Sequence, residues 1–144
     1  MASIQKITPF LWFDNNAKEA AKFYCSVFKN SKIISSSPMS VTFELEGMRF
    51  HGLNGGPLFK FTEAVSLFVS CETQEEVDYY WEKLTAGGAE SRCGWLKDKY
   101  GLSWQIIPEI LGKLLNDADR TKANRAMQAM LQMQKIEIKK LQEA

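Results

Sequence analysis

An internal repeat constrains the fold of this chain more than any other feature of its sequence. Residues 47–53 (Gly-Met-Arg-Phe-His-Gly-Leu) align without a gap with residues 101–107 (Gly-Leu-Ser-Trp-Gln-Ile-Ile), at an offset of 101 − 47 = 54 residues. The alignment pairs His51 with Gln105. Each segment is typical of a turn followed by a short strand. Two equivalent units predict a duplicated fold, in which the units bury their sheet faces against each other or around a shared cavity.

The repeat extends upstream into the predicted helices. Aligning Phe13 with Val69, at an offset of 69 − 13 = 56 residues, superimposes further aromatic and apolar positions. These positions are Phe23 and Tyr24 on Tyr79 and Tyr80, and Phe28 on Leu84. The offsets of 56 and 54 differ by two residues, as trimming of a hairpin would produce.

The first half of the chain predicts the order β-α-β-β-β. Residues 7–13 form a nearly continuous apolar run, which is typical of a strand covered on both faces, and Pro9 in it favours an edge or a bulge. Residues 14–16 (Asp-Asn-Asn) supply capping chemistry for an amphipathic helix over residues 17–28. Three strands then follow, at residues 33–37, 41–45 and 48–53.

The second half repeats this order after a break in composition at residues 54–57 (Asn-Gly-Gly-Pro). Residues 64–71 predict a strand, and Thr73 with Glu76 predicts a capping box at the start of a helix. The side chains expected to face inward on that helix are those of Val77, Tyr80, Trp81 and Leu84, before Gly87 and Gly88 end it. Strands are predicted at residues 90–95, 96–99 and 102–107, with a tight turn at residues 98–101.

The C-terminal segment lies outside the repeat. Residues 109–116 predict a short helix, and Thr121 is a candidate cap for a longer helix that runs to the end. Apolar residues recur along it at helical spacing, at Ala123, Met127, Met130, Leu131, Ile138 and Leu141. This stripe covers either the chain's own sheet or a second subunit, and its length leads us to predict a homodimer.

Together these elements predict an α+β fold. Two paired β-α-β-β-β modules would form a cupped mixed sheet, followed by a C-terminal helical tail. The expected boundaries are residues 1–56 for the first module, 57–108 for the second and 109–144 for the C-terminal helices, all within one structural domain.

Composition argues against several classes of protein. The chain has 144 residues, 18 basic and 17 acidic, and a formal net charge of +1, so no footprint for nucleic acid or a membrane surface is visible. No apolar run approaches the roughly 18 residues that a membrane-spanning helix needs, and the first residues lack the apolar region of a signal peptide. We therefore expect a cytoplasmic protein with no nucleic-acid and no membrane partner. Cys25, Cys71 and Cys93 form no C-x-x-C pair, so we expect reduced thiols.

The chain resembles the PhnB-like group of the vicinal oxygen chelate superfamily, which includes glyoxalase I, bleomycin-resistance proteins and extradiol dioxygenases. The group is also named for a 3-demethylubiquinone-9 3-methyltransferase domain. The matching segments are residues 7–14, 23–24, 54–57, 74–78, 80–81 and 93–108, together with an Ala-Met repeat near Met127 and Met130. The resemblance implies the paired-module architecture and a small-molecule ligand held in the cup between the modules.

The residues do not support methyl transfer from an adenosylmethionine-type donor. Such a donor usually needs a glycine-rich turn after the first strand of a parallel sheet. Here the first predicted strand is followed by Asp14, Asn15 and Asn16, and the pattern predicts antiparallel hairpins.

The resemblance also implies where a metal would lie, because metal-dependent members of the superfamily take ligands from the first and last strands of each module. By position these ligands would fall on His51 and Gln105, and near Thr8 or Pro9 and Ala64 or Val65. Catalytic metal sites generally need three protein ligands of the histidine and carboxylate kinds. Since this set holds one good ligand, His51, we expect no tightly held metal and no cofactor.

The candidate site residues each have two interpretations. His51, the sole histidine, is either a satisfied strand residue or a group for acid–base work and hydrogen bonding to a ligand. Cys93 either packs or acts as a nucleophile beside a cation such as His51 or Lys97. Strand alternation places Phe10 and Trp12 on one face with Thr8. The catalytic candidates are therefore His51 and Cys93, and the ligand-binding candidates are Thr8, Phe10, Trp12, His51 and Gln105.

Two classes of function remain open at this point. The first is a protein that binds a small, partly aromatic molecule without a metal. The second is a small-molecule enzyme of the lyase, isomerase or dioxygenase type, which uses a weakly bound divalent metal or His51 and Cys93. Ligand and divalent-ion screening of the purified protein distinguishes the two classes.

Overall fold

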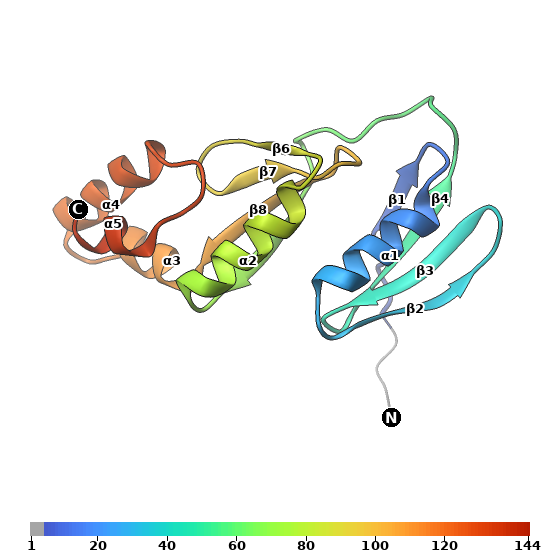
Figure 1. Cartoon of the computed structure of the whole chain (residues 1–144). Coiled ribbons are helices and arrows are strands. Elements are labelled where there is room, and N and C mark those ends of the chain that lie inside the picture. Colours follow the sequence, from blue (N-terminus) through green and yellow to red (C-terminus); the bar gives the residue numbers. More distant parts are fainter. Residues whose placement is uncertain (1–4) are drawn as a thin grey trace. The chain divides into compact units, whose positions relative to one another are not determined.

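The computed structural model describes residues 5–144 and divides the chain into two compact units (Figure 1). The first unit ends at Phe61 and the second begins at Thr62. Each unit contains one four-stranded mixed sheet with a helix across one face. The predicted α+β fold with two repeated β-α-β-β-β modules and a helical tail is confirmed.

The first unit contains β1 (Phe10–Phe13), α1 (Ala17–Val27), β2 (Ser31–Ser36), β3 (Ser40–Leu45) and β4 (Met48–Asn54). Its strands lie in the order β1-β4-β3-β2, with β1 parallel to β4 and the other pairs antiparallel. The second unit contains β5 (Ser66–Cys71), α2 (Gln74–Thr85), β6 (Ala89–Glu90), β7 (Trp95–Lys97) and β8 (Ser103–Pro108). The strands of this sheet lie in the order β5-β8-β7-β6, which is equivalent to the order in the first sheet. β5 is parallel to β8, as β1 is to β4. Residues 91–94, predicted as strand, form a loop instead.

Strand register defines the repeat more exactly than the sequence alignment does. Phe10 lies opposite His51 in the β1–β4 pair, and Phe68 lies opposite Gln105 in the β5–β8 pair. The first strands are therefore related by 68 − 10 = 58 residues, and the predicted offset of 56 is wrong by two. A shift of two residues keeps every side chain on the same face of a strand, so alternation alone could not detect the error.

The helices need a smaller correction. The buried residues Ala20, Tyr24 and Val27 of α1 correspond to Val77, Trp81 and Leu84 of α2 at an offset of 57 residues, one more than predicted. All four side chains expected inward on α2 are buried. Half of the predicted capping box is present, because Thr73 Oγ1 accepts a hydrogen bond from the backbone N–H of Glu76 at 3.2 Å. The Glu76 carboxylate accepts from the N–H of Glu72, one residue before the cap, at 3.3 Å.

The start of α1 differs from the prediction for residues 14–16. The side chain of Asn16, at the cap position, makes no capping hydrogen bond. The N–H of Ala17 instead donates to Oδ1 of Asn54, at the end of β4, at 2.9 Å. This bond joins the helix to the strand that carries His51.

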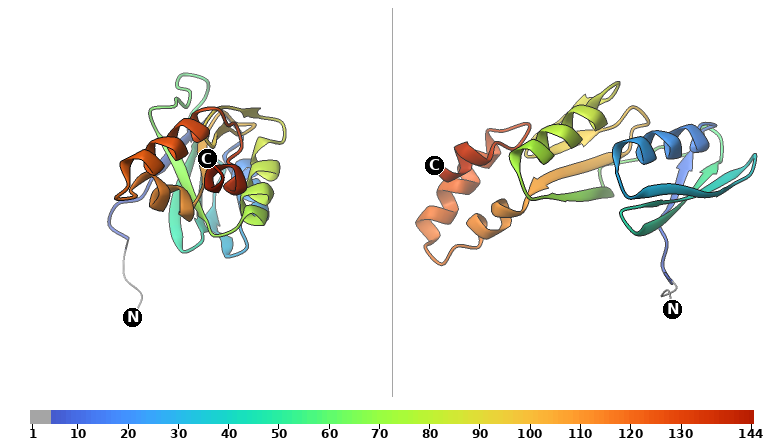
Figure 2. Two further views of the ribbon diagram at one scale, coloured as in Figure 1. Left: turned by 90° about the vertical axis from the view of Figure 1, so that its left-hand side faces the viewer. Right: turned by 60° about the horizontal axis from the view of Figure 1, so that its bottom comes forward.

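Each sheet leaves one face uncovered by its helix. In β1, Leu11 and Phe13 are buried, whereas Phe10 is 60% exposed. The expectation that residues 7–13 are covered on both faces is therefore wrong within this chain. Figure 2 shows α1 and α2 each lying along one face of its own sheet. We call the other face of each sheet its open face.

The C-terminal tail consists of α3 (Glu109–Leu115), α4 (Arg120–Leu131) and α5 (Ile138–Gln142), and it packs on the second unit. The prediction of one helix from Thr121 to the end is wrong. Asp119 caps α4 by accepting from the N–H groups of Thr121 and Lys122, and the helix stops at Leu131. Of the predicted stripe, Ala123 and Leu141 are buried, while Met127 and Leu131 are exposed.

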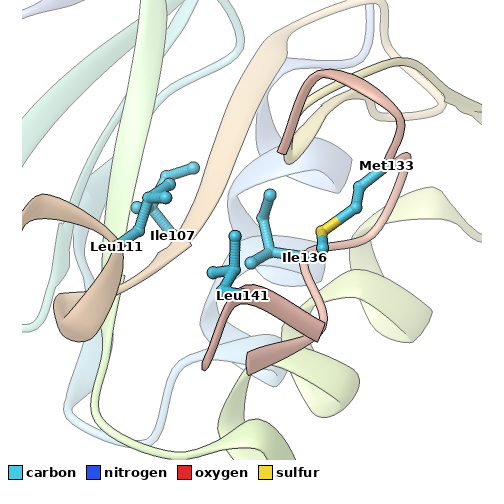
Figure 3. Packing of buried hydrophobic residues seen from close by; sticks show 5 residues of the cluster. All are labelled: Ile107, Leu111, Met133, Ile136 and Leu141. Carbon is cyan, nitrogen blue, oxygen red and sulfur yellow. The ribbon is translucent and has the colours of Figure 1, made fainter. Parts of the chain in front are cut away.

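The buried side of the tail is a cluster centred on the end of β8. Its members are Ile107, Leu111, Met133, Ile136 and Leu141 (Figure 3). Residues 132–137 run between α4 and α5 and supply two of these side chains. The tail thus covers the chain's own second unit, one of the two alternatives left open by the sequence.

Hydrogen bonds fix the tail in place. Gln74 at the start of α2 donates from Nε2 to the carbonyl of Ile136 at 3.0 Å and accepts at Oε1 from the N–H of Ile138 at 2.7 Å. The N–H of Cys93 donates to the carbonyl of Met133 at 2.8 Å. No helix in the described part of the chain is long and apolar enough to cross a membrane.

Candidate functional site

A cavity in the second unit lies on the open face of its sheet, beneath the tail. Its volume is about 550 Å³. The strands β5, β7 and β8 form one wall, and α3 with Met130 of α4 forms the other. The lining residues include Phe68, Cys93, Trp95, Gln105, Ile107 and Met130. The volume falls within the roughly 300–1,000 Å³ typical of small-molecule sites.

Strand alternation directs Gln105 toward this cavity. Its neighbours Trp104 and Ile106 are buried on the opposite face, whereas Gln105 is half-buried. Phe68 of β5 and Trp95 of β7 both lie opposite Gln105 in the two ladders. The carboxamide is therefore flanked by an aromatic residue on each side.

One hydrogen bond orients the Gln105 carboxamide. Nε2 donates to Oγ of Ser66 at 2.9 Å. Among residues 5–144, Gln105 has no second side-chain partner, so Oε1 remains available as an acceptor. The arrangement suits a ligand that offers an N–H or O–H donor beside an aromatic surface.

Cys93 lies in the same cavity, on a loop with an unusual backbone. Its φ is +58° and that of Gly94 is +84°. A Cβ on Gly94 would lie 2.7 Å from Cδ1 of Ile107, so the loop needs glycine there. Lys97, a candidate for activating the thiol, forms an ion pair with Glu63. The structure therefore brings Cys93 and Gln105 together, which the sequence did not predict.

The open face of the first unit carries His51. Its Nδ1 lies 2.9 Å from Oγ1 of Thr42 on the neighbouring strand, and its ring centroid lies 5.8 Å from that of Phe10. Thr8, two residues before β1, is half-buried. This face thus presents an imidazole beside an exposed aromatic ring.

Trp12 is more covered than expected. Its Nε1 donates to the carbonyl of Gly56 at 2.9 Å, and its ring meets that of Phe59 edge-on at 4.9 Å. A Cβ on Gly55 would approach Trp12 to 2.3 Å, so close contact here requires glycine. The segment after β4 therefore occupies the Trp12 surface.

The predicted site residues fall into two groups. Thr8, Phe10, Trp12 and His51 belong to the first unit, and Cys93 and Gln105 to the second. Sequence reasoning missed Phe68, Ser66, Trp95 and Met130. Aligning the first strands at the correct offset would have found Phe68 as the counterpart of Phe10.

The metal-ligating side chains and thiols are dispersed. Among the described residues, no three side chains of His, Cys, Asp or Glu gather closely enough to hold a metal ion. All three cysteines are free in the structure. Burial, with a smaller effect of Glu76, raises the pKa of Cys71 to about 12, and burial also raises the pKa of Cys25.

Comparison with known proteins agrees with the fold. A family model described as 3-demethylubiquinone-9 3-methyltransferase matches residues 5–107. A solved structure described as a putative 3-demethylubiquinone-9 3-methyltransferase, PhnB protein, from Bacillus cereus is 38% identical, with a TM-score of 0.67. The alignment covers 72% of this chain and 99% of that one. No curated protein matches the sequence.

More distant structures share the fold alone. Protein PA1353 from Pseudomonas aeruginosa is 18% identical with a TM-score of 0.61, over 74% of this chain and 98% of that one. The fosfomycin resistance protein FosX from Listeria monocytogenes, complexed with Mn(II) and sulfate ion, is 20% identical with a TM-score of 0.52. That alignment covers 72% of this chain and 88% of the FosX chain.

Proposed function

Because the chain belongs to the 3-demethylubiquinone-9 3-methyltransferase family and has the PhnB-like fold of the vicinal oxygen chelate superfamily, we propose that it binds a small, partly aromatic molecule. The ligand lies in the cavity on the open face of the second unit. The observation that carries the proposal is the position of Gln105, between Phe68 and Trp95 in a cavity of about 550 Å³.

The cavity offers both apolar contact and a polar anchor. Phe68, Trp95, Ile107 and Met130 supply surface for a flat apolar group. The Gln105 Oε1 accepts a hydrogen bond from the ligand, while its Nε2 stays on Ser66. A few placed polar groups on a mostly apolar wall are typical of small-molecule sites.

The corresponding position in the first unit is a separate candidate surface for binding a small molecule. His51 is the counterpart of Gln105, and Phe10 that of Phe68. Since His51 uses Nδ1 toward Thr42, Nε2 is left to meet a ligand group. We assign the aromatic contact there to Phe10 rather than to Trp12, because Phe59 and Gly56 contact the Trp12 ring.

The proposal is binding without a tightly held metal, and not methyl transfer. Serine hydroxyl and glutamine amide groups are weak ligands compared with histidine and carboxylate. The sheet in each unit is mixed, and β1 leads through residues 14–16 into α1 without the glycine-rich turn of a methyl-donor site. The family description therefore does not decide the chemistry of this chain.

A second candidate function is an enzyme that uses Cys93. The observation that favours it is the location of the thiol in the cavity of Gln105, on a loop whose backbone is held at φ +58°. In such an enzyme, the Cys93 thiol would add across an electron-poor C=C bond of a ligand held against Gln105, so that sulfur bonds one carbon, the π bond breaks and the thiol proton ends on the other carbon. Mass spectrometry would then detect a covalent adduct on Cys93, which binding alone does not produce.

The test of the proposed function is a ligand-observed NMR screen of small aromatic compounds, run with and without a chelator. Gln105→Leu should weaken a hit about 5- to 150-fold, because losing a hydrogen bond in a desolvated site costs about 1–3 kcal/mol. The matched control is Gln128→Leu on the exposed surface of α4. Equal affinity in both variants contradicts the assignment of Gln105, and binding that requires a divalent ion contradicts metal-free binding.

A further inference from the structure

A second, smaller cavity of about 270 Å³ lies on the second unit, and Trp95 borders both cavities. Its lining differs in character from that of the first, because it includes Glu63, Glu90, Lys97 and Ser103. One cavity is thus mainly apolar and the other is charged, and Trp95 belongs to the lining of both.

Ser103 provides a polar group without a partner. Its side chain is 1% exposed, and Oγ is the one buried side-chain nitrogen or oxygen in residues 5–144 that has no hydrogen bond. Ser103 lies opposite Lys97 on β7 and two residues before Gln105, so alternation places all three on the open face. A buried hydroxyl without a partner is unfavourable, so a ligand oxygen that accepts from it gains affinity.

In the smaller cavity, Lys97 already contacts a carboxylate of the protein itself. Its Nζ forms an ion pair with Glu63, which lies in the loop before β5, and this contact holds the pKa of the Glu63 carboxyl below its usual value. Both side chains are substantially exposed, and such exposed pairs contribute little stability. A carboxylate brought in by a bound ligand can therefore replace Glu63.

We propose that Lys97 and Ser103 bind the carboxylate of an aromatic acid whose ring lies against Trp95 and Gln105. Glu63 is the internal carboxylate that this ligand displaces. Two residues along a strand span about 6.6 Å, so a linker of one or two methylene groups, as in an arylacetate or arylpropanoate, lets one ligand place its ring beside Gln105 and its carboxylate toward Ser103. This inference rests on the proposed function and adds the class of ligand to it.

The test uses 2-naphthylacetate and its neutral isostere 2-naphthylacetamide, titrated into the full-length protein by calorimetry or ¹H–¹⁵N NMR. We expect the acid to bind about 10-fold more tightly than the amide, from one charge-assisted contact in a partly exposed site. Lys97→Met should remove this preference and leave the affinity for the amide unchanged. Glu63→Gln should strengthen binding of the acid alone, because the competing carboxylate is gone.

Controls separate this inference from the proposed function. Lys83→Met, on the exposed surface of α2, should change neither affinity. Ser103→Ala should weaken binding of the acid. It should leave the melting temperature of the protein unchanged or higher, since it removes the unpaired hydroxyl. Equal binding of acid and amide to the wild type overturns the carboxylate site and leaves the aromatic cavity standing. Binding of neither compound overturns both.

Discussion

Phe10 and Phe68 occupy the same position in the two repeated modules. Each lies on the first strand of its module, opposite a polar residue of the last strand, with which the first strand pairs in parallel. Phe10 is opposite His51 and Phe68 is opposite Gln105. The duplication has therefore kept the aromatic residue and changed its polar partner. An imidazole offers two ring nitrogens, whereas a carboxamide offers an oxygen acceptor and an NH2 donor, so the two modules present different hydrogen-bonding groups on equivalent faces.

Gln74 should stabilise the docked tail. Gln74→Leu removes the hydrogen bonds to Ile136 and Ile138, leaving their backbone groups without this partner. We expect a loss of about 1–3 kcal/mol in the free energy of unfolding, measured by urea denaturation. Limited proteolysis should cut within residues 132–137 first. Gln128→Leu is the control, and equal stability of the two variants would contradict this role.

The contact between Asp78 and Lys135 should make tail docking pH-dependent. The Lys135 ammonium at 2.8 Å and the Gln74 amide hold the pKa of Asp78 below its ordinary value of 3.8. Because the folded pKa is lowered, the stabilisation is present above pH 3.8 and is lost as the pH falls through the folded pKa.

The measurement is the difference in unfolding free energy between wild type and Asp78→Asn. Both side chains are more than a third exposed, so solvent screening limits the difference to at most about 1 kcal/mol at pH 7. It should shrink as the pH falls below 3.8. A difference that grows as the pH falls would contradict the assignment.

The three thiols should differ in reactivity in the native protein. Cys71 is fully buried with a pKa of about 12, so it should not react with a disulfide reagent at pH 8. Cys25, whose pKa is raised by burial, should react slowly. Peptide mapping after timed labelling identifies each site, and all three should react in 8 M urea. Rapid labelling of Cys71 in the folded state would show that its environment opens.

Gly55 should be required for packing of the Trp12 ring. Gly55→Ala places a Cβ within 2.3 Å of that ring, and we expect a cost of about 1–3 kcal/mol from displacement of the indole. Tryptophan fluorescence and thermal unfolding measure the change. Gly112→Ala is the opposite control, because its Cβ meets nothing within 4 Å and alanine favours the α3 helix by about 1 kcal/mol.

The homodimer stays a prediction, but a different observation now supports it. The tail that suggested it covers the second unit, but Phe10 and Phe68 remain 60% exposed on the open faces. Exposed aromatic residues of this size favour contact with another surface. Light scattering at micromolar concentration should give twice the chain mass of 16.4 kDa. A particle of single-chain mass would reject the dimer.

Local patterns in the sequence predicted the elements that local forces determine. Helical spacing located Val77, Tyr80, Trp81 and Leu84 on the buried face of α2, and Thr73 with Glu76 marked its start. The same spacing failed in the tail, because Gln74 binds the backbone at Ile136 and Ile138, where a continuous helix was predicted. That contact joins residues more than sixty positions apart, and periodicity carries no information about it.

The candidate site was predictable only in part for the same reason. Gln105 followed from the repeat, since its counterpart is His51. Its association with Met130 did not, because the second wall of the cavity comes from helices outside the repeat. Its association with Cys93 did not either, because residues 91–94 were predicted as strand and form a loop. Trp12 was assigned to the ligand surface by alternation, and the segment that contacts it lies beyond β4.

The helical wall of the cavity lies outside the segment that the family match covers. The family match ends at residue 107, whereas α3 and Met130 complete the cavity from positions after it. The match over residues 5–107 therefore accounts for only one half of the enclosure. Inferring a substrate from overall similarity in this family thus requires comparing the segment that the similarity leaves out.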